Sequence, residues 1–206
     1  MILLTGFEPF GGDRANPSIG AARRAAELLN DTGQPATAVE LPCVFADAPA
    51  ALRYAMDAYR PDLVVCTGLN AAADGVRLER AALNLVDARI PDNAGAQPVD
   101  VPVVPGGPAA YFTTLPVKRA LAALRDAGVP VQVSHSAGTY VCNQVFYALM
   151  HALADDAGGT RGGFVHVPPT GADGADPELL ARALVLVARE ALDHATDISL
   201  AAGTLA

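Results

Sequence analysis

The sequence predicts an α/β fold, in which a mostly parallel sheet is covered by helices on both faces. Short apolar runs such as Met1–Thr5 and Leu63–Thr67 have the length and composition of strands buried on both sides. Longer segments between such runs carry apolar residues every three or four positions, the pattern of a helix packed on a sheet. Strands that alternate with helices favour parallel pairing, because a helix is the usual connection between parallel strands.

The loop that follows the first strand leads into a helix. Asn16 is suited to be its cap and Pro17 its first residue, where the missing N–H costs nothing. The apolar face of this helix consists of Ile19, Ala22, Ala26 and Leu29. Two short strands are expected next, at Ala36–Leu41 and Val44–Phe45.

The middle of the chain alternates in the same way. Asp47 caps a predicted helix that must end before Pro61, and Leu63–Thr67 is the strand after it. The segment 76–84 fits either a strand or a helix. A passage rich in proline and glycine runs from Pro91 to Pro108, and a loop of this length is expected to be functional or interfacial.

The second half of the chain supplies two more strands and three helices. Pro116 opens a helix that Gly128 closes, and a short strand begins at Val131. A helix then extends to about residue 153, and the strand Gly163–Val167 stops at two prolines. Asp176 begins the last helix, with a cap, a proline and an acidic first turn. No repeat or linker divides the chain, so residues 1–206 are expected to form a single domain.

Composition excludes several classes of function. The 206 residues carry a net charge of −8 without a cluster of lysine and arginine, which disfavours nucleic acid and anionic membranes as partners. The start Met1–Gly6 lacks a basic region and fits a strand better than a signal peptide, and no apolar run approaches membrane-spanning length. Cys43, Cys66 and Cys142 are odd in number and widely spaced, which fits a reduced cytoplasmic protein better than a disulfide framework or zinc site. The glycines at positions 6–12 form no nucleotide-binding motif.

Cys142 is the candidate nucleophile. It follows a short strand and a turn of small residues, with Thr139 as the expected helix cap, Tyr140 as the first helical residue and Cys142 as the third. Unpaired backbone N–H groups and the positive end of the helix dipole would favour the thiolate there, and the thiolate is the reactive form. The alternative is a buried cysteine on a helix face.

A cysteine nucleophile needs a base, and the base needs a group that holds it in one tautomer. His166, near the end of a predicted strand, is the candidate base, and His135 in the turn before Cys142 is its rival. The remaining two histidines lie in predicted helices and are expected at the surface. Glu79 is the candidate orienting group, although a glutamate between apolar residues is usually the solvated residue of an amphipathic element.

Several motifs occur in order along the chain: Gly6–Gly12 with Asn16-Pro17, Glu79-Arg80, Asp87–Asn93, Ser136–Asn143 and Phe164–Pro168. Together they resemble the pyroglutamyl peptidase type I family (pyrrolidone-carboxylate peptidases), and they cover the chain from Leu3 to about Pro168. The resemblance implies a three-layer α/β/α sandwich with an open, mostly parallel mixed sheet. It also implies that Cys142 is the nucleophile, His166 the base and Glu79 the orienting carboxylate of a cysteine exopeptidase.

The implied reaction is hydrolysis of the amide bond after an N-terminal pyroglutamate (5-oxoproline) of peptides and proteins, without a cofactor or a metal. The resemblance further implies a cytoplasmic enzyme, often a homotetramer, whose partners are peptides that begin with pyroglutamate. A pocket for this lactam ring needs flat apolar walls and a few hydrogen-bond partners. The residues expected to bind substrate, by the resemblance or by their place beside the nucleophile, are Phe7, Phe10, Asn16, Tyr140, Val141 and Arg89.

Alternatives exist for several of these roles. Phe7 and Phe10 could simply pack their loop, and Arg89 could form a structural ion pair with a loop carboxylate. Asp92 is the rival of Glu79 as the carboxylate that orients His166. At the level of the whole protein, the alternative is a non-catalytic relative that binds small lactam-like ligands. A nucleoside phosphorylase-like enzyme is disfavoured, because no phosphate-binding cluster of arginines or glycines is visible.

Overall fold

The computed structural model describes residues 1–154, 156, 159–171 and 174–204. A six-stranded sheet with the order β2-β1-β3-β8-β4-β7 forms its centre. All neighbouring strands pair in parallel except β4 and β8, which are antiparallel. The strands of this sheet are β1 (Ile2–Phe7), β2 (Ala36–Leu41), β3 (Leu63–Leu69), β4 (Val76–Glu79), β7 (Val131–Ser134) and β8 (Arg161–Val167).

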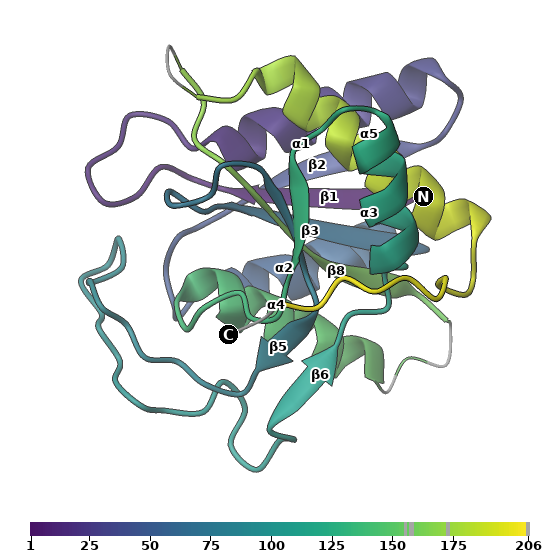
Figure 1. The fold of residues 1–206 in the computed structure, drawn as a ribbon. Helices are drawn as coiled ribbons and strands as arrows, with labels where there is room; N and C mark the ends of the chain where they lie inside the picture. The colour runs from purple at the N-terminus through teal and green to yellow at the C-terminus, as the bar shows by residue number, and fades with distance from the viewer. Residues whose placement is uncertain (155, 157–158, 172–173, 205–206) are drawn as a thin grey trace.

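Five helices in the described residues cover the two faces of the sheet (Figure 1). They are α1 (Pro17–Asp31), α2 (Ala48–Tyr59), α3 (Val117–Asp126), α4 (Val141–Ala154) and α5 (Pro177–Asp193). Helices α1, α3 and α5 share one buried apolar cluster with one face of the sheet, and α2 and α4 share a second cluster with the opposite face. The molecule is therefore the three-layer α/β/α sandwich with a mostly parallel mixed sheet that the sequence predicts.

Local sequence signals account for several helix ends. The side chain of Asn16 accepts a hydrogen bond from the backbone N–H of Ser18, and Asp176 caps α5 in the same way through Glu178. Gly128 follows α3 with a φ of +73°, the left-handed conformation in which glycine commonly ends a helix. These caps confirm the predicted starts of α1 and α5 and the predicted end of α3.

One expected strand is absent, and the open choice for segment 76–84 is decided in favour of strand. Val44–Phe45 is a turn that leads into α2 and not a strand, because the Phe45 N–H is bonded to the carboxylate of Asp92 and not to a neighbouring strand. The segment 76–84 is two strands, β4 and β5 (Ala81–Leu83), separated by Arg80. Strand β5 leaves the main sheet and pairs with β6 (Ala110–Phe112) in an antiparallel ribbon, which lies below the sheet in Figure 1.

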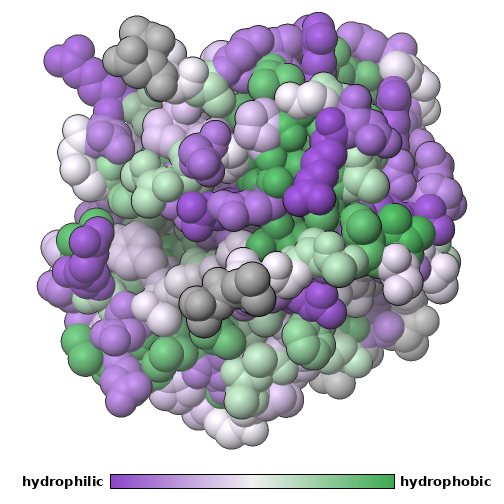
Figure 2. All heavy atoms as spheres, in the orientation of Figure 1, coloured by the Kyte–Doolittle hydropathy of each residue, from purple (hydrophilic) through white to green (hydrophobic). Residues whose placement is uncertain are grey.

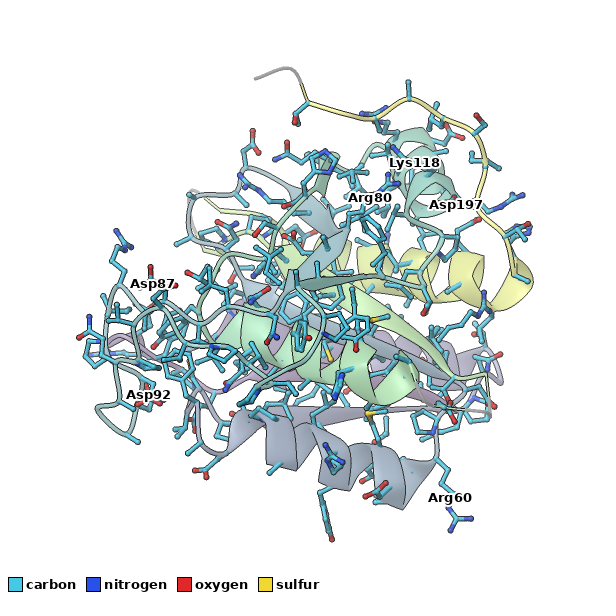
Figure 3. The ribbon with its side chains drawn as sticks, turned by 90° about the horizontal axis from the view of Figure 1, so that it is seen from below. Arg60, Arg80, Asp87, Asp92, Lys118 and Asp197 are labelled. Carbon is cyan, nitrogen blue, oxygen red and sulfur yellow. The ribbon has the colours of Figure 1, made fainter. Side chains whose placement is uncertain are left out.

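The surface turned toward the viewer in Figure 1 mixes hydrophilic and hydrophobic residues (Figure 2). Asp87 and Asp92 lie at one end of the molecule, away from Arg80, Lys118 and Asp197 (Figure 3). Among the helices of the described part of the chain, none is long and apolar enough to cross a membrane.

Candidate active site

A buried histidine–carboxylate pair marks the candidate site. The Nδ1 atom of His166 lies 2.7 Å from Oε1 of Glu79, and the two residues are only 4% and 1% exposed. A hydrogen bond to a carboxylate requires the proton to be on Nδ1, which leaves Nε2 free to accept a proton. The pair thus holds the imidazole in one tautomer, which is the geometry that the predicted roles of His166 and Glu79 require.

Strand register explains how the pair forms. Gly68, His166 and Arg77 are partners in one row across β3, β8 and β4. Phe164 and Glu79 are partners in the neighbouring row, so Glu79 reaches His166 diagonally. Both rows face the layer of α2 and α4, because Phe164 belongs to the apolar cluster on that side.

Helix α4 brings Cys142 to the same face. A Cβ atom placed on Gly68 would lie 2.7 Å from the Cys142 sulfur and 2.9 Å from the ring of Phe164, so the sulfur rests directly on the backbone of β3. Gly68 is the register partner of His166, and therefore the sulfur and the imidazole lie over adjacent strands of one sheet face. The fold brings together the three residues that the sequence nominates as nucleophile, base and orienting group.

The start of α4 differs from the expectation. The helix begins at Val141, which makes Cys142 its second residue and not its third. The Thr139 hydroxyl does not cap the helix and instead donates to the backbone oxygen of Asp87. Gln144 N bonds to Tyr140 O, which leaves the first N–H groups of α4 without an acceptor inside the helix.

The protonation state of Cys142 at rest also differs from the expectation. Burial, with smaller contributions from Cys43 and the Glu79 carboxylate, raises the pKa of the Cys142 thiol well above its ordinary value. Desolvation therefore outweighs the stabilisation of a thiolate that its position at a helix start predicts. The raised pKa favours the neutral thiol, so Cys142 would need a nearby base to react as a thiolate.

The residues that the sequence offers as alternatives to His166 and Glu79 are exposed or bonded to other groups. His135 is exposed in the turn after β7. His151 is bonded to the hydroxyl of Tyr111 at 2.8 Å, and His194 lies 3.5 Å from Glu190. The carboxylate of Asp92 accepts three backbone N–H groups, from Phe45, Ala94 and Ala96. Burial disfavours its charge, but these hydrogen bonds outweigh burial and hold the pKa of Asp92 below its ordinary value.

Aromatic residues from three loops gather around Tyr140, two residues before Cys142. The ring of Tyr140 lies 6.1 Å from that of Phe10 and 5.1 Å from that of Phe45, and its hydroxyl donates to the Pro91 oxygen at 3.0 Å. Phe7 lies deeper, only 1% exposed and 6.5 Å from Phe164 between ring centres. Phe10 and Tyr140 are therefore the more accessible aromatic side chains of this region, whereas Phe7 packs in the core beneath them.

The remaining predicted binding residues have varied surroundings. Val141 is completely buried at the start of α4. Asn16 uses its side-chain oxygen to cap α1 and its amide to bond Glu8 O at 3.1 Å, so it fixes the loop that carries Phe10. Arg89 is exposed, and within the described ranges its side chain has no ion pair closer than 4 Å.

Three residues near the site have roles that the sequence analysis did not assign. Gly68 leaves room for the Cys142 sulfur against β3. Asn143 connects α4 to the segment 83–85 through three hydrogen bonds, and Arg77 is the strand partner of His166. The position of Asn143 directly after the nucleophile was a possible signal. Gly68 and Arg77 gave no signal, because their neighbours are distant in sequence.

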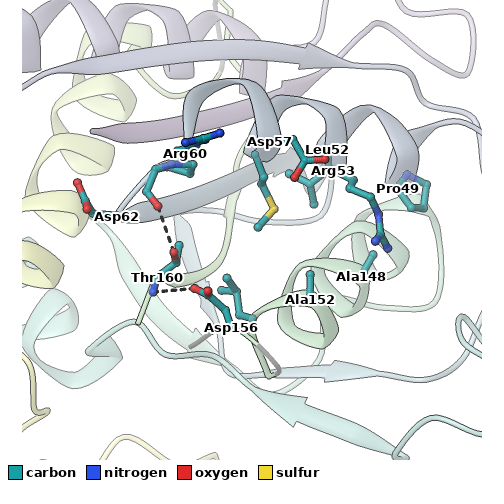
Figure 4. Close-up of a pocket in the computed structure, with 13 residues that line it drawn as sticks. Pro49, Leu52, Arg53, Asp57, Arg60, Asp62, Ala148, Ala152, Asp156 and Thr160 are labelled. Carbon is teal, nitrogen blue, oxygen red and sulfur yellow. Dashed lines mark hydrogen bonds between the residues drawn. The ribbon is translucent and has the colours of Figure 1, made fainter. Parts of the chain in front are cut away.

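A separate groove of about 560 Å³ lies between α2 and α4 on the outer surface (Figure 4). Thr160 lies at one end of it and bonds the Asp156 carboxylate at 3.0 Å and the Pro61 oxygen at 3.2 Å. Its lining contains both signs of charge, with Arg53 and Arg60 beside Asp57 and Asp62. None of Cys142, His166 and Glu79 lines this groove.

The chain is similar to known pyroglutamyl peptidases in sequence and in fold. A family model described as pyroglutamyl peptidase matches residues 1–178. A pyrrolidone-carboxylate peptidase of Streptomyces coelicolor is 56% identical over 81% of this chain and 77% of its own length, and one of Clavibacter michiganensis subsp. michiganensis is 48% identical over 99% and 98%.

Solved structures agree with these sequence matches. The crystal structure of pyroglutamyl peptidase I from Bacillus amyloliquefaciens superposes with a TM-score of 0.90 at 38% identity, covering 97% of this chain and 98% of that one. The pyrrolidone carboxyl peptidase from Thermococcus litoralis gives a TM-score of 0.86 at 32% identity, with coverage of 97% and 98%. On sequence, fold and the residues gathered at the site, the chain belongs to the pyroglutamyl peptidase family.

Proposed function

We propose that this protein is a cysteine exopeptidase that hydrolyses the amide bond after an N-terminal pyroglutamate. Membership of the pyroglutamyl peptidase family supports the substrate class. The observation that carries the chemistry is the buried Glu79–His166 pair on the sheet face where the Cys142 sulfur lies. The alternative of a non-catalytic relative is not favoured, because burying a base and a carboxylate is costly and a binding pocket for an uncharged lactam has no need of them.

In the proposed first half-reaction, Nε2 of His166 takes the proton from the Cys142 thiol as the sulfur attacks the pyroglutamyl carbonyl carbon. The tetrahedral intermediate then collapses, the C–N bond breaks, and His166 returns the proton to the departing amine. A thioester of pyroglutamate with Cys142 remains. Glu79 keeps the proton on Nδ1 and stabilises the imidazolium that forms between the two proton transfers.

In the second half-reaction, His166 removes a proton from water, which attacks the thioester carbonyl carbon. The C–S bond breaks, free pyroglutamate leaves, and the thiol is restored with the proton that His166 held. The first N–H groups of α4 have no intrahelical acceptor, and we propose that they bind the oxyanion in both half-reactions.

The lactam ring is proposed to bind beside α4, against the aromatic side chains of Phe10 and Tyr140. Phe7 and Val141 would support this wall from the core, since both are buried. Asn16 would act by fixing the loop of Phe10 through its hydrogen bond to Glu8. Arg89 is exposed and without an ion pair in the described structure, which supports a contact with substrate over a structural pair.

The resemblance also leads us to propose a cytoplasmic location and a homotetrameric assembly. The three cysteines are free thiols, as in proteins of a reducing compartment. Phe112 and Val99 are 71% and 64% exposed, and a subunit contact would remove these apolar side chains from water. Light scattering coupled to size-exclusion chromatography tests the assembly, and a monomeric mass would contradict it.

The function is tested with pyroglutamyl and prolyl derivatives of one fluorogenic amine, assayed side by side. The wild-type protein is expected to cleave the pyroglutamyl amide only, because the prolyl ring carries an ammonium group in place of the lactam carbonyl and N–H. Cys142→Ala should reduce turnover to the background rate while circular dichroism stays unchanged. Substantial turnover in a folded Cys142→Ala variant would overturn the assignment.

A further inference from the structure

Arg77 places a positive charge beside the proposed base. It is the direct register partner of His166 on β4, and residues that face each other across an antiparallel pair point to the same side of the sheet. Their Cβ atoms are therefore separated by about 5 Å. In the row that begins with Gly68, Arg77 lies between His166 and Gln132 of β7.

The guanidinium of Arg77 is poorly satisfied by the protein itself. Among the described residues its Nε is buried without a hydrogen-bond acceptor, and the side chain makes one bond, a long one of 3.5 Å from a terminal nitrogen to the Ala72 oxygen. In the part of the chain that the structure describes, no carboxylate lies within 4 Å of it. Glu79, the nearest carboxylate on the same strand, is bonded to His166 instead. Arg77 thus keeps donors and a charge available for an external anion.

The order of the strands indicates how a bound pyroglutamyl peptide would lie across the sheet. Phe7 and the loop of Phe10 belong to β1, the Cys142 sulfur lies over β3, His166 is on β8 and Arg77 is on β4. If the lactam ring lies on the aromatic side, the scissile carbonyl carbon meets the sulfur over β3. The departing amine must lie near His166, which protonates it, so the rest of the peptide continues over β4.

We propose that Arg77 binds a carboxylate on the residue that follows pyroglutamate, and so selects among substrates of the proposed reaction. This inference rests on the proposed function. Two sources supply such a carboxylate: the free α-carboxylate of a pyroglutamyl dipeptide, and the side chain of an acidic residue in a longer peptide. A guanidinium binds either through charge-assisted hydrogen bonds, which gain strength where water is partly excluded.

The experiment compares kcat/KM for four substrates at low ionic strength. Pyroglutamyl-alanine and pyroglutamyl-alanine amide differ only in the α-carboxylate, and pyroglutamyl-glutamate amide and pyroglutamyl-glutamine amide differ only in the side chain. Wild type should prefer the acid in at least one pair by roughly tenfold, a typical gain for a charge-assisted contact. The pair that shows the preference identifies the source of the carboxylate. The preference should decrease in high salt, because the contact is partly solvated.

Arg77→Gln should bring the preferred ratio to about one while leaving kcat/KM for the neutral substrate nearly unchanged, and Arg77→Lys should retain part of the preference. Arg80→Gln is the matched control, since it removes an equal charge from a guanidinium that lies 5.8 Å from the Phe112 ring, in a region shared with Lys118 and Asp197.

Wild-type ratios near one in both pairs would overturn the proposal, and this outcome does not depend on whether any variant folds. A loss that is equal for acid and neutral substrates would also overturn it, because Arg77 would then act through Glu79 or His166. Absence of cleavage of every pyroglutamyl compound by wild type would instead refute the proposed function.

Discussion

At the scale of single residues, burial controls the chemistry of the three thiols. Desolvation raises the pKa of Cys43 and of Cys66 to about 12, and these residues are 3% and 0% exposed. Cys142 has a raised pKa as well but is only partly buried, and it lies over the strand next to His166. Partial access to solvent and the neighbouring imidazole of His166, and not a lower pKa of the thiol, therefore distinguish Cys142 from the other two.

This difference predicts selective alkylation. Iodoacetamide at pH 7 should modify Cys142 first, with Cys43 and Cys66 protected until the protein unfolds. In His166→Ala the Cys142 thiol loses the imidazole that is proposed to take its proton, and alkylation requires the thiolate. Labelling of Cys142 should therefore slow by about tenfold or more at pH 7, and the difference should narrow as the pH rises, because hydroxide ion can then deprotonate the thiol. Mass spectrometry of timed samples measures the rates, and equal rates at pH 7 would contradict a role of His166 as base.

Substitutions of the two candidate carboxylates, Glu79 and Asp92, are expected to affect kcat and stability differently. Glu79→Gln keeps an oxygen for Nδ1–H but removes the charge that stabilises the imidazolium, so kcat should fall by roughly 10²- to 10⁴-fold. Asp92→Asn should retain most of kcat and instead lower the melting temperature, because its new N–H₂ group faces backbone N–H donors of Phe45, Ala94 or Ala96. Steady-state kinetics and thermal unfolding of both variants check this. A larger kcat loss in Asp92→Asn would transfer the orienting role to Asp92.

At the scale of elements, the site depends on how closely α4 approaches β3. The sulfur can rest on the strand only because residue 68 has no side chain. Asn143 holds the start of α4 by bonding Leu83 N, Leu83 O and Leu85 O, much as another strand would. The position of the Cys142 sulfur is thus set by its contact with β3 and by the hydrogen bonds of Asn143 to the segment 83–85.

Gly68→Ala tests this close contact. Its Cβ would come within 2.7 Å of the Cys142 sulfur, so the sulfur must move, and a displacement near 1 Å at a reacting atom costs about 10²-fold in rate. We expect kcat to fall by about that factor with a cooperative unfolding transition retained. Gly20→Ala is the control, because a Cβ there meets nothing within 4 Å and alanine favours the helix α1. Equal activity of the two variants would show that the sulfur does not depend on Gly68.

At the scale of the whole molecule, the two helical layers have different roles. The layer of α2 and α4 carries Cys142 and faces His166 and Glu79, whereas α1, α3 and α5 enclose the larger apolar cluster on the other side. The last part of the chain strengthens this second layer. The carboxylate of Asp197 accepts the N–H groups of Lys118 and Arg119 in the first turn of α3, each at 2.9 Å, and so supplies the cap that Pro116 cannot.

Removing this distant cap should affect stability alone. Asp197→Ala is expected to lower the free energy of unfolding by about 1 kcal/mol, the usual value of a helix cap. Its kcat/KM should equal that of wild type, since α3 lies on the face of the sheet opposite Cys142. Urea unfolding and the amide assay measure the two quantities. A large loss of activity under conditions where the variant is folded would contradict this separation of the layers.

The sequence by itself determined what depends on neighbouring residues. Alternation of apolar runs and amphipathic segments gave the α/β class, and the pairs Asn16-Pro17 and Asp176-Pro177 gave helix starts, because caps act within a few residues. The motifs around Cys142, His166 and Glu79 nominated the residues that the fold brings together.

Only the tertiary structure decided what depends on residues far apart in the chain. The antiparallel pairing of β4 with β8 sets Glu79 and Arg77 around His166, and no local pattern specifies that pairing. The turn at Phe45 forms because Asp92 accepts a hydrogen bond from its N–H, and the raised pKa of the Cys142 thiol results from desolvation by other elements. Register and burial are properties of the assembled sheet and its layers, so they appear only once distant segments have packed together.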